Sequence, residues 1–164
     1  MMDAMGDGFW TGDESGLPDP ARDAQFYDGV PVRRLVAFLI DLAVILAIDV
    51  AAIAVLWILG IVTFGLTWLL IGVAWFGLGF FYRVWALGSG RSATPGMRLT
   101  GIEIRNAKGR RLTMSEALIH TGALYVVFFF APLVVVSVAM MALGARGRGL
   151  HDLPLGSTAI NTPV

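Results

Sequence analysis

The feature that most constrains this chain is an apolar run over residues 32–59 that is long enough to cross a lipid bilayer. A helix rises about 1.5 Å per residue, so the run exceeds the roughly 20 residues that a hydrocarbon core of ~30 Å requires. The run nevertheless contains Arg34, Asp41 and Asp49. If Arg34 lies at the membrane interface, Asp41 lies about 10 Å deeper and Asp49 about 22 Å deeper, too far for a short side chain to reach water.

These charged residues occupy one side of the predicted helix. Arg34 and Asp41 are seven residues apart, almost two turns, so they project from the same face, and Asp49 lies about 80° around it. A charge at the centre of a spanning helix costs about 2.5–3.5 kcal/mol on insertion scales, so it persists where it is paired, protonated or facing water. Two interpretations stay open: these residues join helices through hydrogen bonds, or they form a functional site.

Composition indicates an integral membrane protein. Hydrophobic residues make up 57% of the chain and charged residues 15%, whereas soluble domains are about 45–50% apolar and about 25% charged. The mean hydropathy is +0.75. Apolar residues concentrate in three blocks, 32–59, 62–87 and 117–143. This pattern predicts an all-α membrane protein with about three transmembrane helices, in one membrane domain over residues 32–160.

The two ends of the chain are predicted to be tails. Residues 1–31 hold seven acids against the single base Arg22, with many Gly, Pro and Asp residues and no apolar periodicity. The segment also lacks the apolar stretch of a signal peptide. We expect a disordered acidic tail that ends where Pro31 starts the first helix, and a short C-terminal tail over residues 161–164.

The second apolar block ends in an aromatic cluster around one cation. Phe81, Tyr82 and Trp85 flank Arg83. Because aromatic and basic side chains mark the depth of the membrane interface, we expect Arg83 to be an interfacial anchor rather than a ligand. The uncharged segment 60–63 before this block is so short that the first two helices must form an antiparallel hairpin.

The segment 88–113 fixes the predicted orientation, because it carries six basic residues against one acid. By the positive-inside rule this loop is cytoplasmic, which places the N-terminus in the cytoplasm and segment 60–63 outside. Within the loop, the alternation over 102–105, the turn over 106–109 and the return over 110–113 predict a small cytoplasmic β-hairpin.

The third apolar block, 117–143, follows a capping box made by Thr113 and Glu116, and Pro132 interrupts it. Proline removes a backbone hydrogen bond and kinks or breaks a helix. A single kinked span, which we favour, sends residues 144–164 outside although they carry two arginines. A break at Pro132 instead makes a re-entrant segment that returns these residues to the cytoplasm.

Few residues in the chain suit a chemical site. His120 lies near the predicted cytoplasmic interface, where it is either an interfacial polar residue or a titratable partner for one of the aspartates. The chain has no cysteine and two histidines, and it lacks the common nucleophile, nucleotide and zinc signatures. We therefore expect no enzyme activity, no cofactor and no metal site. No basic helix face is interleaved with aromatic residues, so we expect no nucleic-acid partner.

Three motifs together resemble the RDD family of small membrane proteins. They are VRRLVAFLID in the first helix, TPGMRLTGIEI followed by GRRLT, and RGLHDLPLGSTAI near the end. The resemblance covers about residues 28–160. The arginine and the two aspartates that give the family its name correspond to Arg34, Asp41 and Asp152, with Arg33 as the alternative match for the arginine.

The chain departs from the family pattern at three positions. The usual lysine after the proline-glycine pair is Met97, a basic position in the third helix is His120, and Asp49 is outside the named set. The resemblance implies an involvement in transport, with cation–proton antiport for some members. A single kinked third span would place Arg34 and Asp152 on opposite sides of the membrane, whereas a re-entrant segment would allow them to pair.

We therefore expect a small component of a transport system in the bacterial cytoplasmic (inner) membrane. Asp41, Arg34 and Asp49 would line a polar path for a proton or a monovalent cation, with His120 and Asp152 as further candidates. Three helices are too few to enclose a path, so we expect a homo-oligomer or a larger membrane complex within the lipid bilayer. The alternative is a non-transporting accessory or assembly subunit whose charged residues pair with a larger complex.

Overall fold

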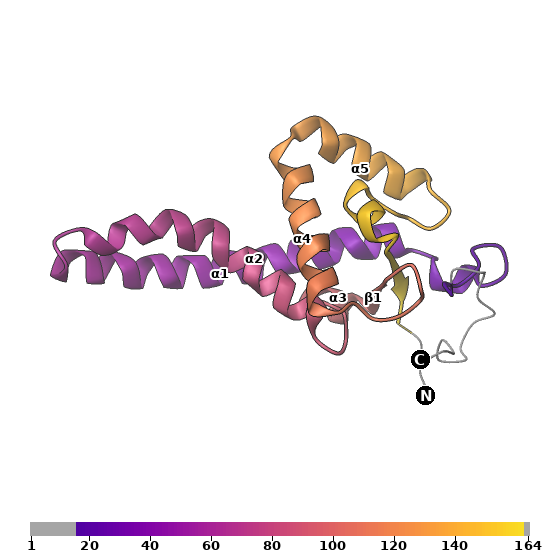
Figure 1. Ribbon diagram of the computed structural model, residues 1–164, viewed down its shortest axis with the longest axis horizontal. Helices are drawn as coiled ribbons and strands as arrows, with labels where there is room; N and C mark the ends of the chain where they lie inside the picture. Colours follow the sequence, from indigo (N-terminus) through magenta and orange to yellow (C-terminus); the bar gives the residue numbers. More distant parts are fainter. Residues whose placement is uncertain (1–15, 163–164) are drawn as a thin grey trace.

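The computed structural model describes residues 16–162, which fold mainly into helices (Figure 1). The long helix α1 (Val30–Val62) and helix α2 (Ile71–Gly88) lie antiparallel as a hairpin, joined through the 3₁₀-helix η2 (Leu66–Leu70). The remaining elements gather beside the first half of α1, and the far half of the hairpin projects away from them (Figure 1). The predicted hairpin of the first two apolar blocks is therefore confirmed.

The hairpin has the length and surface of a membrane-spanning element. At about 1.5 Å per residue, the 33 residues of α1 extend roughly 50 Å, more than the hydrocarbon core of a bilayer. The helical stretches 24–62 and 66–88 are both long and apolar enough to cross a membrane. Large apolar side chains remain exposed along both helices, for example Ile61 and Val73. Such a surface suits lipid and not water, as expected for an integral membrane protein.

The third apolar block folds as two separate helices, α4 (Met114–Phe129) and α5 (Ala131–Leu143). The predicted capping box is present at the start of α4. Phe130 has an extended backbone and Pro132 lies in the first turn of α5, where proline is tolerated because that N–H needs no helical partner. The axes of the two helices bend by 119°, so the favoured single kinked span is wrong and the chain turns back at this point (Figure 1).

The predicted β-hairpin is wrong in its second strand. Strand β1 (Ile102–Arg105) pairs antiparallel with β2 (Thr158–Asn161) near the end of the chain, and Arg111 makes only an isolated bridge to Arg105. The turn over 106–109 does form, with the Arg110 carbonyl accepting from the Asn106 amide at 2.9 Å. Strand β2 is the better partner because it carries two apolar residues that become fully buried with those of β1, whereas 110–113 carries two arginines and only one apolar residue. The fully buried apolar residues of the two strands are Ile102, Ile104, Ala159 and Ile160.

The predicted disordered tail is wrong for residues 16–31, while residues 1–15 lie outside the described residues. Leu17 is fully buried, and the 3₁₀-helix η1 (Ala24–Phe26) precedes α1. The Asn161 side-chain amide donates to the Gln25 and Asp28 carbonyls at 2.8 and 3.0 Å, which also makes Asn161 part of the folded domain and not of a C-terminal tail. Residues 163–164 lie outside the described residues.

A small apolar core fixes the position of the site. It includes residues from the start of α1, the end of α2, both strands and the start of α4: Val30, Ala37, Leu87, Ile102, Ile104, Leu112, Ala117 and Ala159. The short helix α3 (Pro95–Thr100) packs on α1, and the 3₁₀-helix η3 (Leu150–Leu155) packs on α4 and α5. Burial of these apolar side chains brings the polar residues of α1 against loops from the rest of the chain.

Candidate functional site

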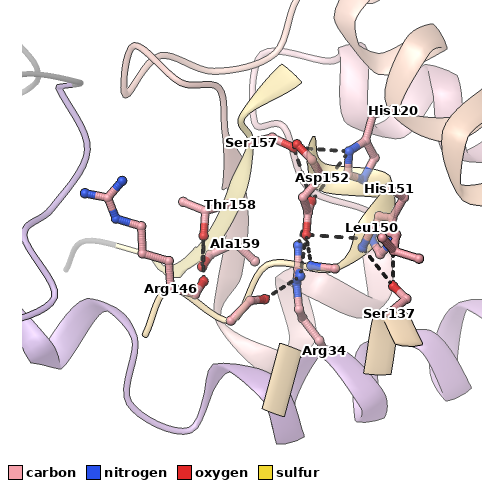
Figure 2. Close-up of polar contacts among 12 residues, drawn as sticks. Arg34, His120, Ser137, Arg146, Leu150, His151, Asp152, Ser157, Thr158 and Ala159 are labelled. Carbon is pink, nitrogen blue, oxygen red and sulfur yellow. Dashed lines mark hydrogen bonds and ion pairs between the residues drawn. The ribbon is translucent and has the colours of Figure 1, made fainter. Parts of the chain in front are cut away.

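Arg34 and Asp152 form a buried ion pair that joins the start of α1 to η3 (Figure 2). The two guanidinium nitrogens donate to the two carboxylate oxygens at 2.8 and 3.1 Å, the bidentate geometry that makes arginine–carboxylate pairs strong. Arg34 also donates to the Gly147 carbonyl at 2.9 Å, and the Gly149 amide donates to Asp152 at 2.8 Å. Two residues predicted as site candidates are therefore brought together, as the turn at Pro132 permits.

Two histidines flank this ion pair. His120 Nδ1 lies 3.7 Å from Asp152 Oδ1, and His151 Nε2 lies 3.9 Å from Oδ2. The Ser157 hydroxyl lies between, 3.3 Å from His120 Nδ1 and 3.1 Å from Asp152 Oδ1 (Figure 2). His120 is 2% exposed, and its position beside Asp152 is the one expected for a partner of an aspartate. Ser157 and His151 were not singled out from the sequence, because only the folded chain brings them to α1 and α4.

The His120, His151 and Asp152 side chains offer one ligand atom each within 4.8 Å of one another. Both oxygens of Asp152, however, accept hydrogen bonds from the Arg34 guanidinium. A metal cation placed among these three residues would have to displace a positive charge from the carboxylate and leave that charge buried. The arrangement therefore fits a structural clasp, which we call the Arg34–Asp152 clasp, better than a metal centre.

The charges of the clasp follow from its surroundings. Burial by itself would raise the pKa of Asp152, but the Arg34 charge and the neighbouring histidines hold that pKa well below its usual value. Burial lowers the pKa of His151 by more than the Asp152 carboxylate raises it. At neutral pH the clasp therefore holds one carboxylate, one guanidinium and a neutral His151 imidazole.

Asp41 is fully buried and holds the loop before α3. It accepts hydrogen bonds from the Tyr82 hydroxyl at 2.9 Å, the Thr94 hydroxyl at 2.5 Å and the Gly96 amide at 2.9 Å. A Cβ atom on Gly96 would lie 2.9 Å from Asp41 Oδ1 and would also collide with α1 backbone, so this contact requires glycine. Arg34 and Asp41 thus share a helix face, but each has its own partners.

Asp49 differs from the other two aspartates in the hydrogen bonding of its carboxylate. The residue is 3% exposed, and its Oδ1 atom, which we call the open oxygen of Asp49, has no hydrogen-bond partner among residues 16–162. The Tyr125 hydroxyl of α4 is close enough for an electrostatic interaction with Asp49 but is not hydrogen-bonded to it. A buried oxygen without a partner is costly, and this sets Asp49 apart from Asp41 and Asp152, whose oxygens all accept hydrogen bonds.

Comparison with known protein families shows which family this chain belongs to. The family model described as RDD family matches residues 29–156, which is most of the chain. The chain belongs to the RDD family. No curated protein and no solved structure matches it at a significant level. In this RDD protein the residues that correspond to the named arginine and aspartates are Arg34, Asp41 and Asp152, and each is fixed by partners from a distant part of the chain.

Arg83 is a further buried charged residue of this RDD protein. It is 8% exposed, and its guanidinium lies 5.5 Å from the centre of the Phe38 ring, so it points into the fold and is not exposed to the bilayer as an anchoring side chain would be. The stacking on Phe38 is a cation–π contact. Arg83, Arg34, His120 and His151 all line one cavity of about 380 Å³ between α1, α4 and α5. No local pattern in the sequence predicts this cavity, because its walls come from segments on both sides of the bend at Pro132.

Proposed function

We propose that this RDD protein is a small component of a membrane transport system in which a proton or a monovalent cation moves past Asp49. One observation carries the proposal: Asp49 is buried in a helix long enough to span the membrane, and one of its oxygens has no partner among the described residues. Ionisable residues inside spanning segments mark ion paths and proton relays. By helical rise, Asp49 lies about 22 Å along α1 from Arg34.

The other two aspartates support the path instead of forming its binding group. Asp41 accepts three hydrogen bonds and Asp152 is held by Arg34, so neither can take up a cation without first losing partners inside the chain. Their role in the proposal is to hold the loop before α3 and η3 against α1. The proposed role is not enzymatic, and the lone carboxylate of Asp49 does the chemistry of binding and release.

The proposal includes an assembly, because α1 and α2 cannot enclose a path by themselves. Copies of this chain would supply the missing walls by packing around the α1–α2 hairpin, in the symmetric arrangement that is the commonest among soluble oligomers. We place the assembly in the bacterial cytoplasmic membrane, with the basic loop 88–113 and the N-terminus on the cytoplasmic side.

Proteoliposomes containing only the purified chain test this function. Imposed gradients of Na⁺, K⁺ or H⁺ should drive flux with the wild-type protein, and Asp49→Asn should abolish it while leaving the melting temperature in detergent unchanged. The matched control is Asp28→Asn, an exposed aspartate outside α1, which should keep wild-type flux. Wild-type flux in a folded Asp49→Asn protein would contradict the role of Asp49, and absence of flux from the wild type would contradict transport by the chain alone.

A second candidate function is a non-transporting accessory subunit. The open oxygen of Asp49 favours it equally, because a donor from a different membrane protein could satisfy that oxygen. Arg34 and Asp41 do not favour it, since their partners are already inside the chain. Stable copurification with one defined membrane complex, lost in Asp49→Asn and kept in Asp28→Asn, would support this second function over the first.

A further inference from the structure

Arg83 is a buried cation that forms no direct ion pair within residues 16–162. Its guanidinium packs on the Phe38 ring, but no carboxylate of residues 16–162 lies within ion-pair distance and no acceptor among them is hydrogen-bonded to it. Arg34, the other buried arginine of the cavity, is neutralised by Asp152. The Asp41 carboxylate lines the same cavity and attracts Arg83 electrostatically, but it lies beyond ion-pair distance and already accepts three hydrogen bonds. A buried guanidinium without a direct ion pair is unfavourable, so Arg83 is a site where an anion would stabilise the folded chain.

The cavity that Arg83 lines has the size and walls of a binding site. Its volume of about 380 Å³ falls within the roughly 300–1,000 Å³ of small-ligand sites, and apolar side chains make up most of its surface. Leu35, Phe128 and Val138 line it and are also about half exposed on the outside of the chain. The apolar wall therefore continues from the interior to the surface, where a membrane protein meets lipid.

The position of Arg83 on α2 matches the depth of lipid headgroups. Phe81 and Trp85, two residues before and after it, are 70% and 72% exposed. Exposed aromatic rings of this kind favour the boundary between headgroups and acyl chains. A ligand that enters the cavity from this boundary would bring an anionic group to Arg83 and an apolar chain to the walls.

We propose that this cavity binds one anionic phospholipid of the bilayer, with the lipid phosphate on the Arg83 guanidinium and an acyl chain between α1, α4 and α5. A second copy of this chain is a poorer occupant, because an apolar helix would cover the mouth but leave Arg83 without an anion. The proposal does not rest on transport, since the ligand is held by Arg83 and the cavity walls and not by Asp49.

Lipid binding to the purified full chain in a neutral detergent tests the proposal. Native mass spectrometry counts bound lipid, and the melting temperature reports stabilisation. Three probes separate the chemistry: phosphatidylglycerol, diacylglycerol with the same acyl chains, and inorganic phosphate. We expect phosphatidylglycerol to remain bound as one molecule and to raise the melting temperature, with smaller effects from diacylglycerol, which lacks the phosphate, and from phosphate, which lacks the chains.

Variants assign the binding to Arg83 and the walls. Arg83→Gln should weaken phosphatidylglycerol binding roughly ten- to a hundredfold, because a hydrogen bond to a charged group is lost. Arg83→Lys should restore part of it. The matched control Arg91→Gln, at an exposed arginine of the following loop, should bind as the wild type does. Val134→Trp keeps Arg83 but fills the cavity from α5, so it should also weaken binding.

The outcomes decide the proposal in either direction. Loss of binding in Arg83→Gln and Val134→Trp, with retention in Arg91→Gln, supports it. Equal binding of diacylglycerol and phosphatidylglycerol by the wild type would overturn it, as would equal stabilisation by inorganic phosphate. If Arg83→Gln does not fold, Val134→Trp and Arg83→Lys decide, and wild-type affinity in both would also overturn the proposal.

Discussion

Arg34 and Asp152, separated by 118 residues in the sequence, face each other across a buried bidentate contact at the start of α1. The pair ties the first long helix to the segment after the last helix. The attraction within a buried ion pair offsets the cost of desolvation only when the geometry is good and further hydrogen bonds satisfy the remaining polar atoms of both side chains. Here Arg34 also donates to the Gly147 carbonyl, and Asp152 also accepts from the Gly149 amide. We therefore interpret the clasp as a device that fixes one arrangement of the chain ends.

The first prediction is that breaking the clasp on one side destabilises the protein more than removing both charges. Arg34→Met leaves a buried carboxylate without its cation and should cost about 3–5 kcal/mol, as other broken buried pairs do. Arg34→Met combined with Asp152→Leu removes both charges and should recover a large part of that loss. Chemical unfolding in detergent, followed by tryptophan fluorescence, measures each variant.

The matched control for this cycle is Arg33→Met, which removes a neighbouring exposed arginine whose side chain donates to the Thr100 carbonyl at 3.2 Å. It should change the free energy of unfolding by less than about 0.5 kcal/mol. Additive losses in the double variant would show that Arg34 and Asp152 act independently, contrary to the observed contact.

The second prediction compares two aspartates on the same helix. Asp41→Asn should destabilise by about 1–3 kcal/mol, because an amide offers one acceptor oxygen where the carboxylate serves three donors. Asp49→Asn should leave stability unchanged or raise it, since no described residue is hydrogen-bonded to the open oxygen and the amide is cheaper to bury. Melting temperatures of the two variants test the difference, and equal losses would contradict it.

Much of the fold followed from local patterns in the sequence. The apolar run 32–59 predicted α1, Thr113 and Glu116 predicted the start of α4, and Pro132 predicted an interruption. Each of these signals depends on residues within a turn or two of one another. The angle at Pro132 does not, because it is set by packing of α5 on η3, and so the preferred single span was wrong.

The partners of the candidate residues were harder to predict than the candidates. Arg34, Asp41 and Asp49 stand out as charges in an apolar helix, whatever they contact. That Arg34 meets Asp152 while Asp41 meets the loop before α3 depends on long-range packing, which periodicity does not report. The pairing of β1 with β2 in place of its sequence neighbour has the same cause. For Arg83 the local pattern was misleading. Its aromatic neighbours in the sequence predicted an exposed anchor, whereas the side chain is buried in the folded chain.

The third prediction concerns pH. The pKa of His151 in the folded chain lies below its ordinary value of about 6.5. At a pH between the folded-state pKa and about 6.5, the unfolded chain therefore binds a proton at His151 that the folded chain does not. Stability should therefore be flat above about pH 7 and should fall as the pH drops below 6.5, by up to about 1.4 kcal/mol per pH unit from this group. The pKa of Asp152 is lowered from 3.8, so its contribution is complete above that pH and is lost only at lower pH.

Melting curves of the wild type and of His151→Gln between pH 5 and 8 check this prediction. The glutamine keeps a polar side chain beside Asp152 but has no group that titrates in this range, so its curve should fall less steeply below pH 6.5. An unchanged slope in His151→Gln would assign the pH dependence to other groups.

The last prediction tests the arrangement of the chain across the membrane with single cysteines, which this cysteine-free protein allows. Lys108 and Thr162 are exposed, and the pairing of β1 with β2 requires them to lie on one side of the membrane. Phe64 is fully exposed at the other end of the α1–α2 hairpin. In intact cells a membrane-impermeant thiol reagent should label Phe64→Cys and spare both Lys108→Cys and Thr162→Cys, because the basic loop 88–113 is predicted to be cytoplasmic.

Labelling of all three cysteine variants after permeabilisation of the cells is the control for reactivity. If both Lys108→Cys and Thr162→Cys were labelled from outside, the orientation would be opposite to the predicted one, but the β1–β2 pairing would still hold. If only Thr162→Cys of the two were labelled from outside, the result would contradict the β1–β2 pairing and support a single kinked third span.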